Sequence, residues 1–403
     1  MHLGVLEFHP IQYRAPLYQL LASRGNIDLD VLFLSDHGYH PAVDPGFGVP
    51  VAWDIDLLSG YQSSFLTTVD HPASLAGRAR ELSSWILSHD AVVVHGYVHP
   101  WMLCAMGICR TRGVPYILRG ESHPEGQSTG VRRTLRNAVA RIAVSGSADN
   151  LSIGQLNTEF YRRYGARQIT LAPYSVDDER FARAPDIRRP ELLTRWGLEE
   201  TRPLIVFCGK LIPRKRPLDL VQAISLLPDK VSTLFVGDGA IAGEVRASLP
   251  SGEAAVTGFI NQAELPSYYH AADIFVLPSE AEPWGLVVNE AMAAGALPVV
   301  SDRVGAGPDL VQGIGEVYPC GDVTGLTQAL RRALAKVAEP RIRERVRQRV
   351  VPYSLSATAA GFEEAALNLA AATRRNSLSS LLLAADPPRA QCRHSSRVTT
   401  RAA

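Results

Sequence analysis

The residues LPSEAEPWGLVVNEAMAAGALPVVSD, numbers 277–302, combine a strand, a loop and a helix in one short segment. An apolar run that ends at Leu277 predicts a buried strand, and a polar loop follows it. A helical pattern begins near Gly285 and stops before Gly295, a residue type that often ends helices in the left-handed conformation. This order of elements is typical of open parallel sheets, which bind ligands at the carboxyl ends of their strands.

Two glutamates lie in this segment where both can face one ligand. Glu282 is in the loop, and Glu290 lies about one and a half turns into the helix, with its Cβ tilted toward the helix N-terminus. The first N–H groups of the helix favour a phosphate, and carboxylates accept hydrogen bonds from hydroxyls. These preferences favour a sugar nucleotide. The alternative is that Glu282 is a solvated loop charge and Glu290 a surface residue.

Short apolar runs alternate with helical patterns through the whole chain, and this alternation predicts parallel sheets built from βαβ units. In the first half we expect strands at 3–8, 27–35, 91–96, 114–120 and 140–146, and helices at 15–23, 100–111 and 132–140. In the second half we expect strands at 203–209, 232–239, 254–259, 273–279 and 297–302, and helices at 217–227 and 286–294.

A polar, proline-containing stretch at 172–190 interrupts this alternation. A chain of 403 residues also exceeds the length that one hydrophobic core usually organises. We therefore expect an α/β protein with two Rossmann-like domains that face a cleft. The expected divisions are an N-terminal domain at 1–175, a C-terminal domain at 176–352, a helix at 353–372 that crosses back to the first domain, and a disordered basic tail at 373–403.

Composition and charge narrow the class of protein. Hydrophobic residues make up 46% and charged residues 20%, which is the globular range. The net charge of +1 gives no overall attraction to nucleic acid. No apolar run approaches the ~18 residues of a membrane span, and we do not expect residues 1–21 to act as a secretory signal, because they lack a cationic start and their first apolar run is broken at Glu7. With five scattered cysteines, these features predict a cytoplasmic protein, with a peripheral contact at the inner face of the membrane left open.

A cationic loop follows one of the predicted strands. The sequence FCGKLIPRKRPLDLV, residues 207–221, places Lys210, Arg214, Lys215 and Arg216 between the end of a strand and the next helix, with no acid among them. Such a loop at the carboxyl end of a strand matches a diphosphate. Alternatively, the cations form a solvated face.

Together these segments resemble the donor half of glycosyltransferase family 4, which has the GT-B fold and transfers sugars with retention and without a metal. The resemblance rests on FCGKLIPRK, LFVGDG, VTGF, YYHAADIFVLPS, VVSDRVGAGPDLV and the pair Glu282 and Glu290, and it is close over 203–322. It implies transfer of a sugar from a nucleotide diphosphate sugar to an acceptor hydroxyl in glycan or glycoconjugate biosynthesis. The implied partners are this co-substrate and a saccharide or lipid-linked saccharide, with no cofactor, metal or nucleic acid.

The resemblance also implies roles for individual residues. Lys210 and Lys215 are similar in position to the cations that bind the donor diphosphate, and Glu282 to the catalytic glutamate that binds sugar hydroxyls. The remaining implied contacts are the N–H groups of Gly285, Leu286 and Val287 for the diphosphate, Glu290 for the ribose, and Phe259 or Ile260 for the nucleobase.

Two departures from the family pattern lie in the N-terminal half. The family usually has a Gly-Gly loop after its first strand, whereas this chain has FHPIQYRAP, in which Gln12 or Tyr13 could replace the loop on the phosphate side. Many members have a histidine where this chain has Glu121, and His123 follows two residues later. We expect Glu121 and His123 to be catalytic or to hold the acceptor. The alternative is that Glu121 forms a structural ion pair with Arg119.

Two other functions stay open on the sequence alone. A sugar-nucleotide epimerase of the same architecture would keep the nucleotide site but use acid and base groups around the sugar. A non-catalytic protein that binds nucleotide sugars would explain the replaced Gly-Gly loop and the replaced histidine. Release of nucleotide that depends on an added acceptor separates transfer from both alternatives.

Overall fold

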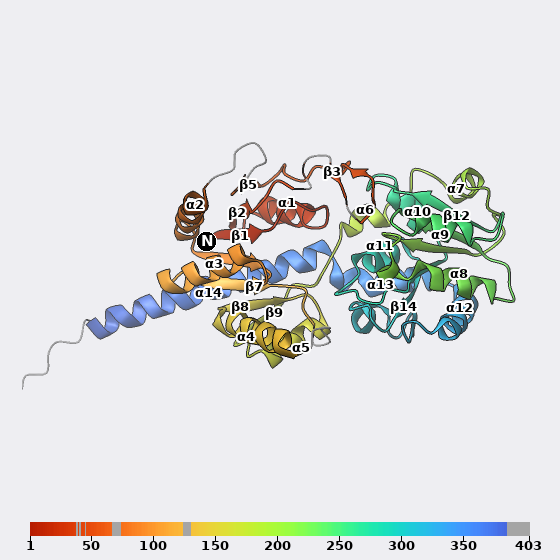
Figure 1. Cartoon of the computed structure of the whole chain (residues 1–403). Helices are drawn as coiled ribbons and strands as arrows, with labels where there is room; N and C mark the ends of the chain where they lie inside the picture. The colour runs from red at the N-terminus through yellow and green to blue at the C-terminus, as the bar shows by residue number, and fades with distance from the viewer. Residues whose placement is uncertain (38, 40–41, 45, 67–73, 124–129, 385–403) are drawn as a thin grey trace, which may run out of the picture.

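The computed structural model describes residues 1–37, 39, 42–44, 46–66, 74–123 and 130–384. Two parallel sheets lie side by side, each covered by helices, and the first half of the chain forms one sheet while the second half forms the other (Figure 1). The predicted α/β class with two Rossmann-like sheets is confirmed. The exact domain divisions at 175/176 and 352/353 stay predictions.

Within the described residues, the first sheet has seven strands in the order β5-β2-β1-β6-β7-β8-β9. Its strands are β1 (His2–Glu7), β2 (Asp28–Phe33), β5 (Gln62–Phe65), β6 (Ala91–His95), β7 (Tyr116–Arg119), β8 (Asp149–Ser152) and β9 (Ile169–Leu171). The helices beside them are α1 (Ala15–Arg24), α2 (Leu75–Leu87), α3 (Pro100–Arg112), α4 (Gly130–Gly146) and α5 (Gln155–Arg163). A small antiparallel pair, β3 (Ala42–Val43) and β4 (Pro50–Val51), stands apart from this sheet.

The second sheet has six strands in the order β12-β11-β10-β13-β14-β15. They are β10 (Leu204–Cys208), β11 (Ser232–Val236), β12 (Ala254–Gly258), β13 (Ile274–Leu277), β14 (Leu297–Ser301) and β15 (Glu316–Tyr318). Its helices are α6 (Asp178–Ala182), α7 (Arg189–Arg195), α8 (Pro217–Ser225), α9 (Ala242–Ala247), α10 (Leu265–Ala271), α11 (Leu286–Ala294), α12 (Val323–Val337) and α13 (Ile342–Val350), with shorter turns η1 (Pro213–Lys215), η2 (Gly307–Val311) and η3 (Val351–Tyr353).

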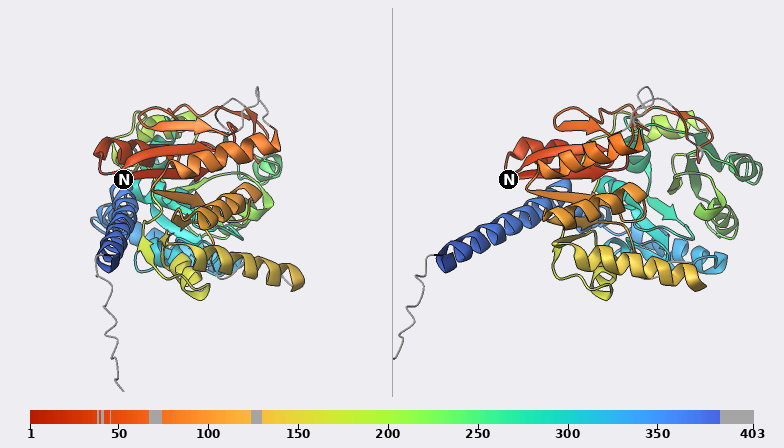
Figure 2. Two further views of the ribbon diagram at one scale, coloured as in Figure 1. Left: turned by 90° about the vertical axis from the view of Figure 1, so that its left-hand side faces the viewer. Right: turned by 60° about the vertical axis from the view of Figure 1, so that its left-hand side comes forward.

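The final helix, α14 (Leu355–Ala384), returns to the first sheet as predicted, and its later part projects away from both sheets (Figures 1 and 2). Phe362 is fully buried in the core of the first sheet, and Arg24 of α1 pairs with Glu363 at 3.2 Å. Close to its start, Thr358 contacts Ser175 through their hydroxyls at 2.6 Å. The helix tethers the end of the second half to the first sheet.

One prediction about the chain's secondary structure is wrong. Residues 140–146, expected as a strand, lie in α4, because Ala140, Ala143 and Val144 are buried at the spacing of a helix. Helix α14 continues beyond 372, where the helix was expected to end, as far as Ala384, and the prediction of a disordered tail concerns mostly 385–403, which lie outside the described residues. None of the helices in the described ranges has both the length and the hydropathy that a membrane span requires.

Both sheets reverse their strand order next to a central strand. In the first sheet the reversal lies between β1 and β6, and in the second between β10 and β13. Loops that leave adjacent strands in opposite directions at such a point open a crevice at the carboxyl ends of the strands. The topology therefore places a ligand crevice beside Glu7 and His95 in the first sheet, and beside Cys208 and Leu277 in the second.

Candidate functional site

A cavity of about 330 Å³ lies between the two sheets and is called the lysine pocket here. Its walls include most of the residues predicted for the donor site: Gln12, Tyr13, Lys210, Lys215, Phe259, Ile260, Val287 and Glu290. Asp44, Phe47 and Trp53, from the chain before the first-sheet strand β5, complete the wall. The pocket thus joins residues that are far apart in the sequence.

Lys210 makes an ion pair across this pocket. Its Nζ lies 2.7 Å from Asp44 Oδ1 and 3.0 Å from Oδ2, and 4.9 Å from the centre of the Phe47 ring. Asp44 Oδ1 also accepts hydrogen bonds from the N–H groups of Gly46 and Phe47. A carboxylate from one half of the chain therefore neutralises a lysine of the other half.

Lys215 and Glu282 form a second ion pair, and each side chain is about 15% exposed or less. Lys215 ends the turn η1, and Glu282 lies in the loop before α11, where it makes an isolated bridge with Val304. Glu282 is thus held beside the lysine pocket by Lys215 without lining it.

Glu290 is fully buried in α11. Tyr269 donates a hydrogen bond to its Oε2 at 2.7 Å, while its Oε1 has no hydrogen-bond partner in the described part of the chain. Burial raises the pKa of this carboxyl to about 7, against the opposing effects of Tyr269 and Arg180. An unpartnered buried oxygen is costly to the protein alone and is free to accept a hydrogen bond from a ligand hydroxyl.

The N-terminus of α11 lies beside the pocket. Gly285 precedes the helix with φ 98°, and a Cβ at this position would approach Leu277, Glu282 and Val304 to 3.1–3.2 Å. The first N–H groups of a helix have no partner within it. Of the three residues predicted to offer N–H groups, Val287 lines the pocket, whereas Gly285 and Leu286 do not.

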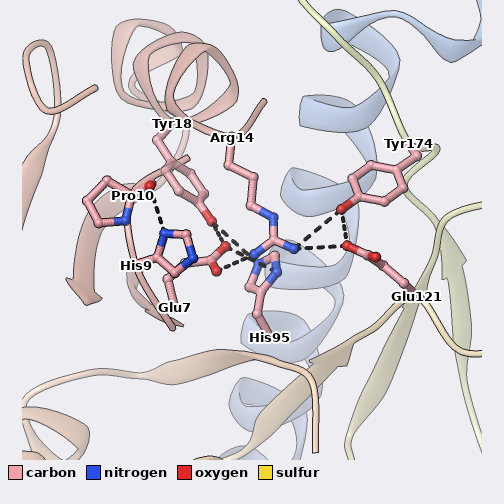
Figure 3. Close-up of polar contacts among 8 residues, drawn as sticks. All are labelled: Glu7, His9, Pro10, Arg14, Tyr18, His95, Glu121 and Tyr174. Atoms are coloured by element: carbon pink, nitrogen blue, oxygen red, sulfur yellow. Dashed lines mark hydrogen bonds and ion pairs between the residues drawn. The ribbon is translucent and has the colours of Figure 1, made fainter. Parts of the chain in front are cut away.

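A second cavity, of about 400 Å³, is called the Glu7 pocket here. Its wall includes Glu7, Arg14, His95, Arg119, Glu121, His123 and Tyr174 from the first half, and Pro283 from the second. Figure 3 shows its polar centre, where Arg14 lies between Glu7 and Glu121. The predicted catalytic residues Glu121 and His123 therefore meet here, apart from the lysine pocket.

Glu7 is buried at the carboxyl end of β1 and has three polar partners. Arg14 and Tyr18 donate hydrogen bonds to it, and His95 Nδ1 lies 3.2 Å from its Oε1. Burial raises the pKa of the Glu7 carboxyl, although Arg14 opposes this. Burial also holds the pKa of His95 well below its usual range, with further lowering by Arg14 and Arg119.

Glu121 accepts a hydrogen bond from the Tyr174 hydroxyl and lies 3.3 Å from Arg14 Nη2. Its side chain is 43% exposed, so it remains open to a ligand. Arg119, the partner considered from the sequence, instead donates to the Ala172 carbonyl at 2.8 Å and packs over the Tyr174 ring. The Arg119–Glu121 ion pair is thus wrong, and Arg14 is the cation beside Glu121.

Comparison with known proteins identifies the family. A sequence model described as glycosyl transferases group 1 matches residues 202–336. A 2-deoxystreptamine glucosyltransferase of Streptomyces kanamyceticus is 30% identical over 61% of this chain and 68% of its own length. The chain belongs to the group 1 glycosyltransferases.

Two further comparisons concern a sequence relative and a solved structure. A sulfoquinovosyl transferase of Arabidopsis thaliana is 34% identical over 42% of this chain, and the match spans about a third, 34%, of that relative's length. The structure of a sucrose-phosphate synthase from Thermosynechococcus elongatus has a TM-score of 0.71 at 20% identity and covers 92% of this chain and 100% of that one. The structural likeness shows the shared GT-B fold.

Sequence reasoning missed several residues of this glycosyltransferase that the pockets bring together. Asp44, Phe47 and Trp53 belong to a segment without strong periodicity, and no local pattern relates them to Lys210. Glu7 ends the first strand, and a carboxylate at the carboxyl end of a central strand was a usable signal for a site. Arg14 gave no such signal, because its partners are far apart in the sequence: Glu7 ends β1, and Glu121 lies in the loop after β7.

Proposed function

We propose that this glycosyltransferase binds a nucleotide diphosphate sugar in the lysine pocket and transfers the sugar, with retention, to an acceptor hydroxyl held in the Glu7 pocket. The observation that carries the proposal is the unpartnered Oε1 of Glu290, which is buried in a pocket wall that also holds Lys210 and Lys215. One acceptor oxygen and two ammonium groups match a ribose hydroxyl and a diphosphate.

The proposed donor contacts follow from charge and position. The diphosphate would lie between Lys210, Lys215 and the N-terminus of α11, where Val287 lines the pocket. To reach Lys210 it displaces the Asp44 carboxylate. As the leaving group departs, these cations stabilise its added negative charge.

The base would lie in the aromatic part of the lysine pocket. The ring centres of Phe259 and Phe47 are 5.0 Å apart, and those of Phe259 and Trp53 are 6.2 Å apart. Ile260 lines the same wall. These apolar side chains, partly supplied by the first half of the chain, provide contact area for a planar base.

The donor assignment is tested by comparing Glu290→Gln with Glu282→Gln in calorimetric titrations. Glu290→Gln should weaken binding of the free nucleotide and the nucleotide sugar alike, because its proposed partner is the ribose. Glu282→Gln should weaken only ligands that contain the sugar. If Glu282→Gln weakens binding of the free nucleotide and Glu290→Gln does not, the two roles are assigned wrongly.

The acceptor side rests on Glu121 and His123, which line one pocket. In the proposed reaction Glu121 accepts a hydrogen bond from a sugar hydroxyl, or stabilises positive charge on the sugar ring. Glu121→Gln should lower kcat by tenfold or more, about 1.4 kcal/mol at the transition state, with an unchanged melting temperature. A fully active and equally stable variant would transfer this role to His123.

The acceptor is proposed to be a saccharide, either free or attached to a lipid. Assays with matched free and lipid-linked acceptors distinguish the two, since only a lipid-linked preference calls for contact with a membrane surface. Nucleotide release that depends on the acceptor supports transfer. Release or conversion of the sugar nucleotide without any acceptor would contradict it and favour an epimerase.

A further inference from the structure

Two histidines and an aspartate lie close together near the amino ends of the strands in the first sheet, whereas the pockets lie at the carboxyl ends. His2 begins β1, whereas Glu7 ends it, Asp30 lies in β2, and His89 follows α2. One ligand atom from each of His2, Asp30 and His89 lies within 4.8 Å of the others. Residues 2, 30 and 89 are so widely separated that no sequence motif predicts this cluster.

The backbone makes room for this cluster at Gly4. A Cβ at Gly4 would lie 2.7 Å from the Trp85 ring and 3.1 Å from His89 Cγ. Gly4 pairs with Asp30 in the sheet register, so the missing side chain opens space beside that carboxylate. The space is occupied by the rings of Trp85 and His89, whose centres are 4.4 Å apart.

Hydrogen bonds to backbone carbonyls assign the protons of both histidines. His89 Nδ1 lies 2.6 Å from the Trp85 carbonyl, and His2 Nδ1 lies 2.9 Å from the Ser88 carbonyl. A carbonyl only accepts, so each Nδ1 carries a proton, and in the neutral form of either ring the lone pair is on Nε2. The two ring centres are 4.0 Å apart, a distance at which two imidazolium charges would repel each other.

Two buried polar atoms of the cluster have no hydrogen-bond partner among the residues that the structure describes. They are Asp30 Oδ1 and His89 Nε2, and the latter lies 3.4 Å from Asp30 Oδ2. The His89 side chain is 0% and the Asp30 side chain 9% exposed. Trp85 Nε1 donates to Asp30 Oδ2 at 2.7 Å and fixes the carboxylate. A cation between these lone pairs would remove the cost of leaving them unpaired.

We propose that His2, Asp30 and His89 bind a divalent transition-metal ion, with zinc as the ion that fits best. Two ligands on a tetrahedral zinc ion with bonds of about 2.0 Å are about 3.3 Å apart, close to the 3.4 Å between His89 Nε2 and Asp30 Oδ2. Imidazole nitrogens favour zinc over Mg²⁺ or Ca²⁺, which prefer oxygen. The carbonyls that hold both Nδ1 atoms are the outer contacts expected around metal-binding histidines.

The ion would fasten three elements together. It would join the start of β1, the strand β2 and the chain that follows α2, and the 33% exposed His2 side chain leaves a side open for entry and for a water ligand. Because the site lies at the amino ends of the strands, it is separate from the pockets at their carboxyl ends. Its role is to stabilise the fold.

The test uses the full chain after removal of metals by chelation and dialysis. We expect about one equivalent of Zn²⁺ to bind per chain and to raise the melting temperature. Co²⁺ should produce the intense visible absorption of a four-coordinate ion, which Zn²⁺ then displaces. These measurements need no variant, so absence of both stoichiometric binding and the Co²⁺ spectrum overturns the proposal.

Variants then assign the ligands. His89→Gln and Asp30→Asn should each weaken Co²⁺ binding about tenfold or more. Glu81→Gln, which removes an exposed carboxylate from α2, serves as the matched control and should leave binding unchanged. Equal Co²⁺ affinity in all three variants would place the ion elsewhere, and would leave Asp30 and a protonated His89 as a simple ion pair.

Discussion

Glu290 places an ionisable group in the wall of the lysine pocket, with one oxygen hydrogen-bonded to Tyr269 and the other buried without a partner among the described residues. Because burial raises its pKa in the folded chain from 4.5 to about 7, the folded state binds this proton more tightly than the unfolded state. The contribution of Glu290 to stability is therefore greatest below pH 4.5 and falls as the pH rises through 7.

Replacing Glu290 should therefore change how the free energy of unfolding depends on pH. Between pH 5 and 7.5 the free energy of unfolding of Glu290→Gln should fall less steeply than that of the wild type, with a difference of up to about 3 kcal/mol. Urea unfolding at several pH values measures the two slopes. Glu244→Gln, at an exposed position in α9, is the control. Parallel slopes for Glu290→Gln and wild type would contradict the raised pKa.

The same carboxyl should report donor binding. A ribose hydroxyl that donates to Glu290 favours the ionised form, so binding of a nucleotide sugar near pH 6.5 should release protons to the buffer. Calorimetry in buffers of different ionisation enthalpy measures this release, and nucleotide sugars carry no phosphate that titrates near neutrality. Release that persists undiminished in Glu290→Gln would assign it to another group.

Variants in the two lysine ion pairs should have opposite effects on the affinity for a nucleotide diphosphate. Lys215→Ala should weaken binding of a nucleotide diphosphate by about tenfold or more, since a charge-assisted hydrogen bond contributes roughly 1.5–3 kcal/mol. Asp44→Asn should strengthen it several-fold, because the diphosphate no longer competes with a carboxylate for Lys210. Calorimetric Kd values measure both effects. Weaker binding by Asp44→Asn would show that Asp44 supports the donor site.

For single residues, the local sequence indicated the site residues of the second half of the chain, but not their partners from the first half. Lys210 and Lys215 stand in a recognisable cationic loop, and Glu290 stands at a fixed place in its helix. Asp44 is 166 positions from Lys210, and no local pattern links the two. Contacts between distant loops depend on how the two sheets pack, which periodicity does not encode.

At the scale of elements, α11 was predicted with its observed bounds, because glycines mark both of its ends. Gly285 and Gly295 have φ values of 98° and 92°, in the region that other residues rarely adopt. The expected strand at 140–146 failed because buried residues at 140, 143 and 144 fit a helix. The strands β5 and β8, with sequences QSSF and DNLS, are too short and polar to show strand periodicity.

Gly285 gives a prediction for the helix it precedes. Gly285→Ala should destabilise the protein by about 1–3 kcal/mol, through its positive φ and the contacts of the added Cβ with Leu277, Glu282 and Val304. It should also weaken donor binding by moving Glu282. Chemical unfolding and calorimetry measure the two effects.

The control for this change is Gly243→Ala in α9, where an added Cβ meets no atom within 4 Å. Alanine is favoured over glycine inside a helix, so this variant should gain about 0.5–1 kcal/mol of stability. If both variants shift stability in the same direction, the conformation at Gly285 is not what limits that position.

At the scale of the whole molecule, α14 completes the core of the first sheet with residues from the end of the described chain. Phe362→Ala should cost about 3–5 kcal/mol, because the ring is fully buried and Arg119 lies 5.1 Å above it. Leu367→Ala, in the same helix at a side chain 53% exposed, should cost less than about 0.5 kcal/mol. Chemical unfolding compares the two variants. A loss of less than about 0.5 kcal/mol for both would place α14 outside the cooperative core.

The contact between Ser175 and Thr358 joins the two places where the chain passes between the sheets. Thr358 also donates to the Pro173 carbonyl at 2.6 Å, and Asp178 accepts from the Leu355 N–H at 3.0 Å. Two adjacent covalent connections would oppose translation and twisting of the sheets, and would leave rotation about their common line as the least costly relative motion. In such a rotation Asp44 would separate from Lys210 and return to it along a single arc.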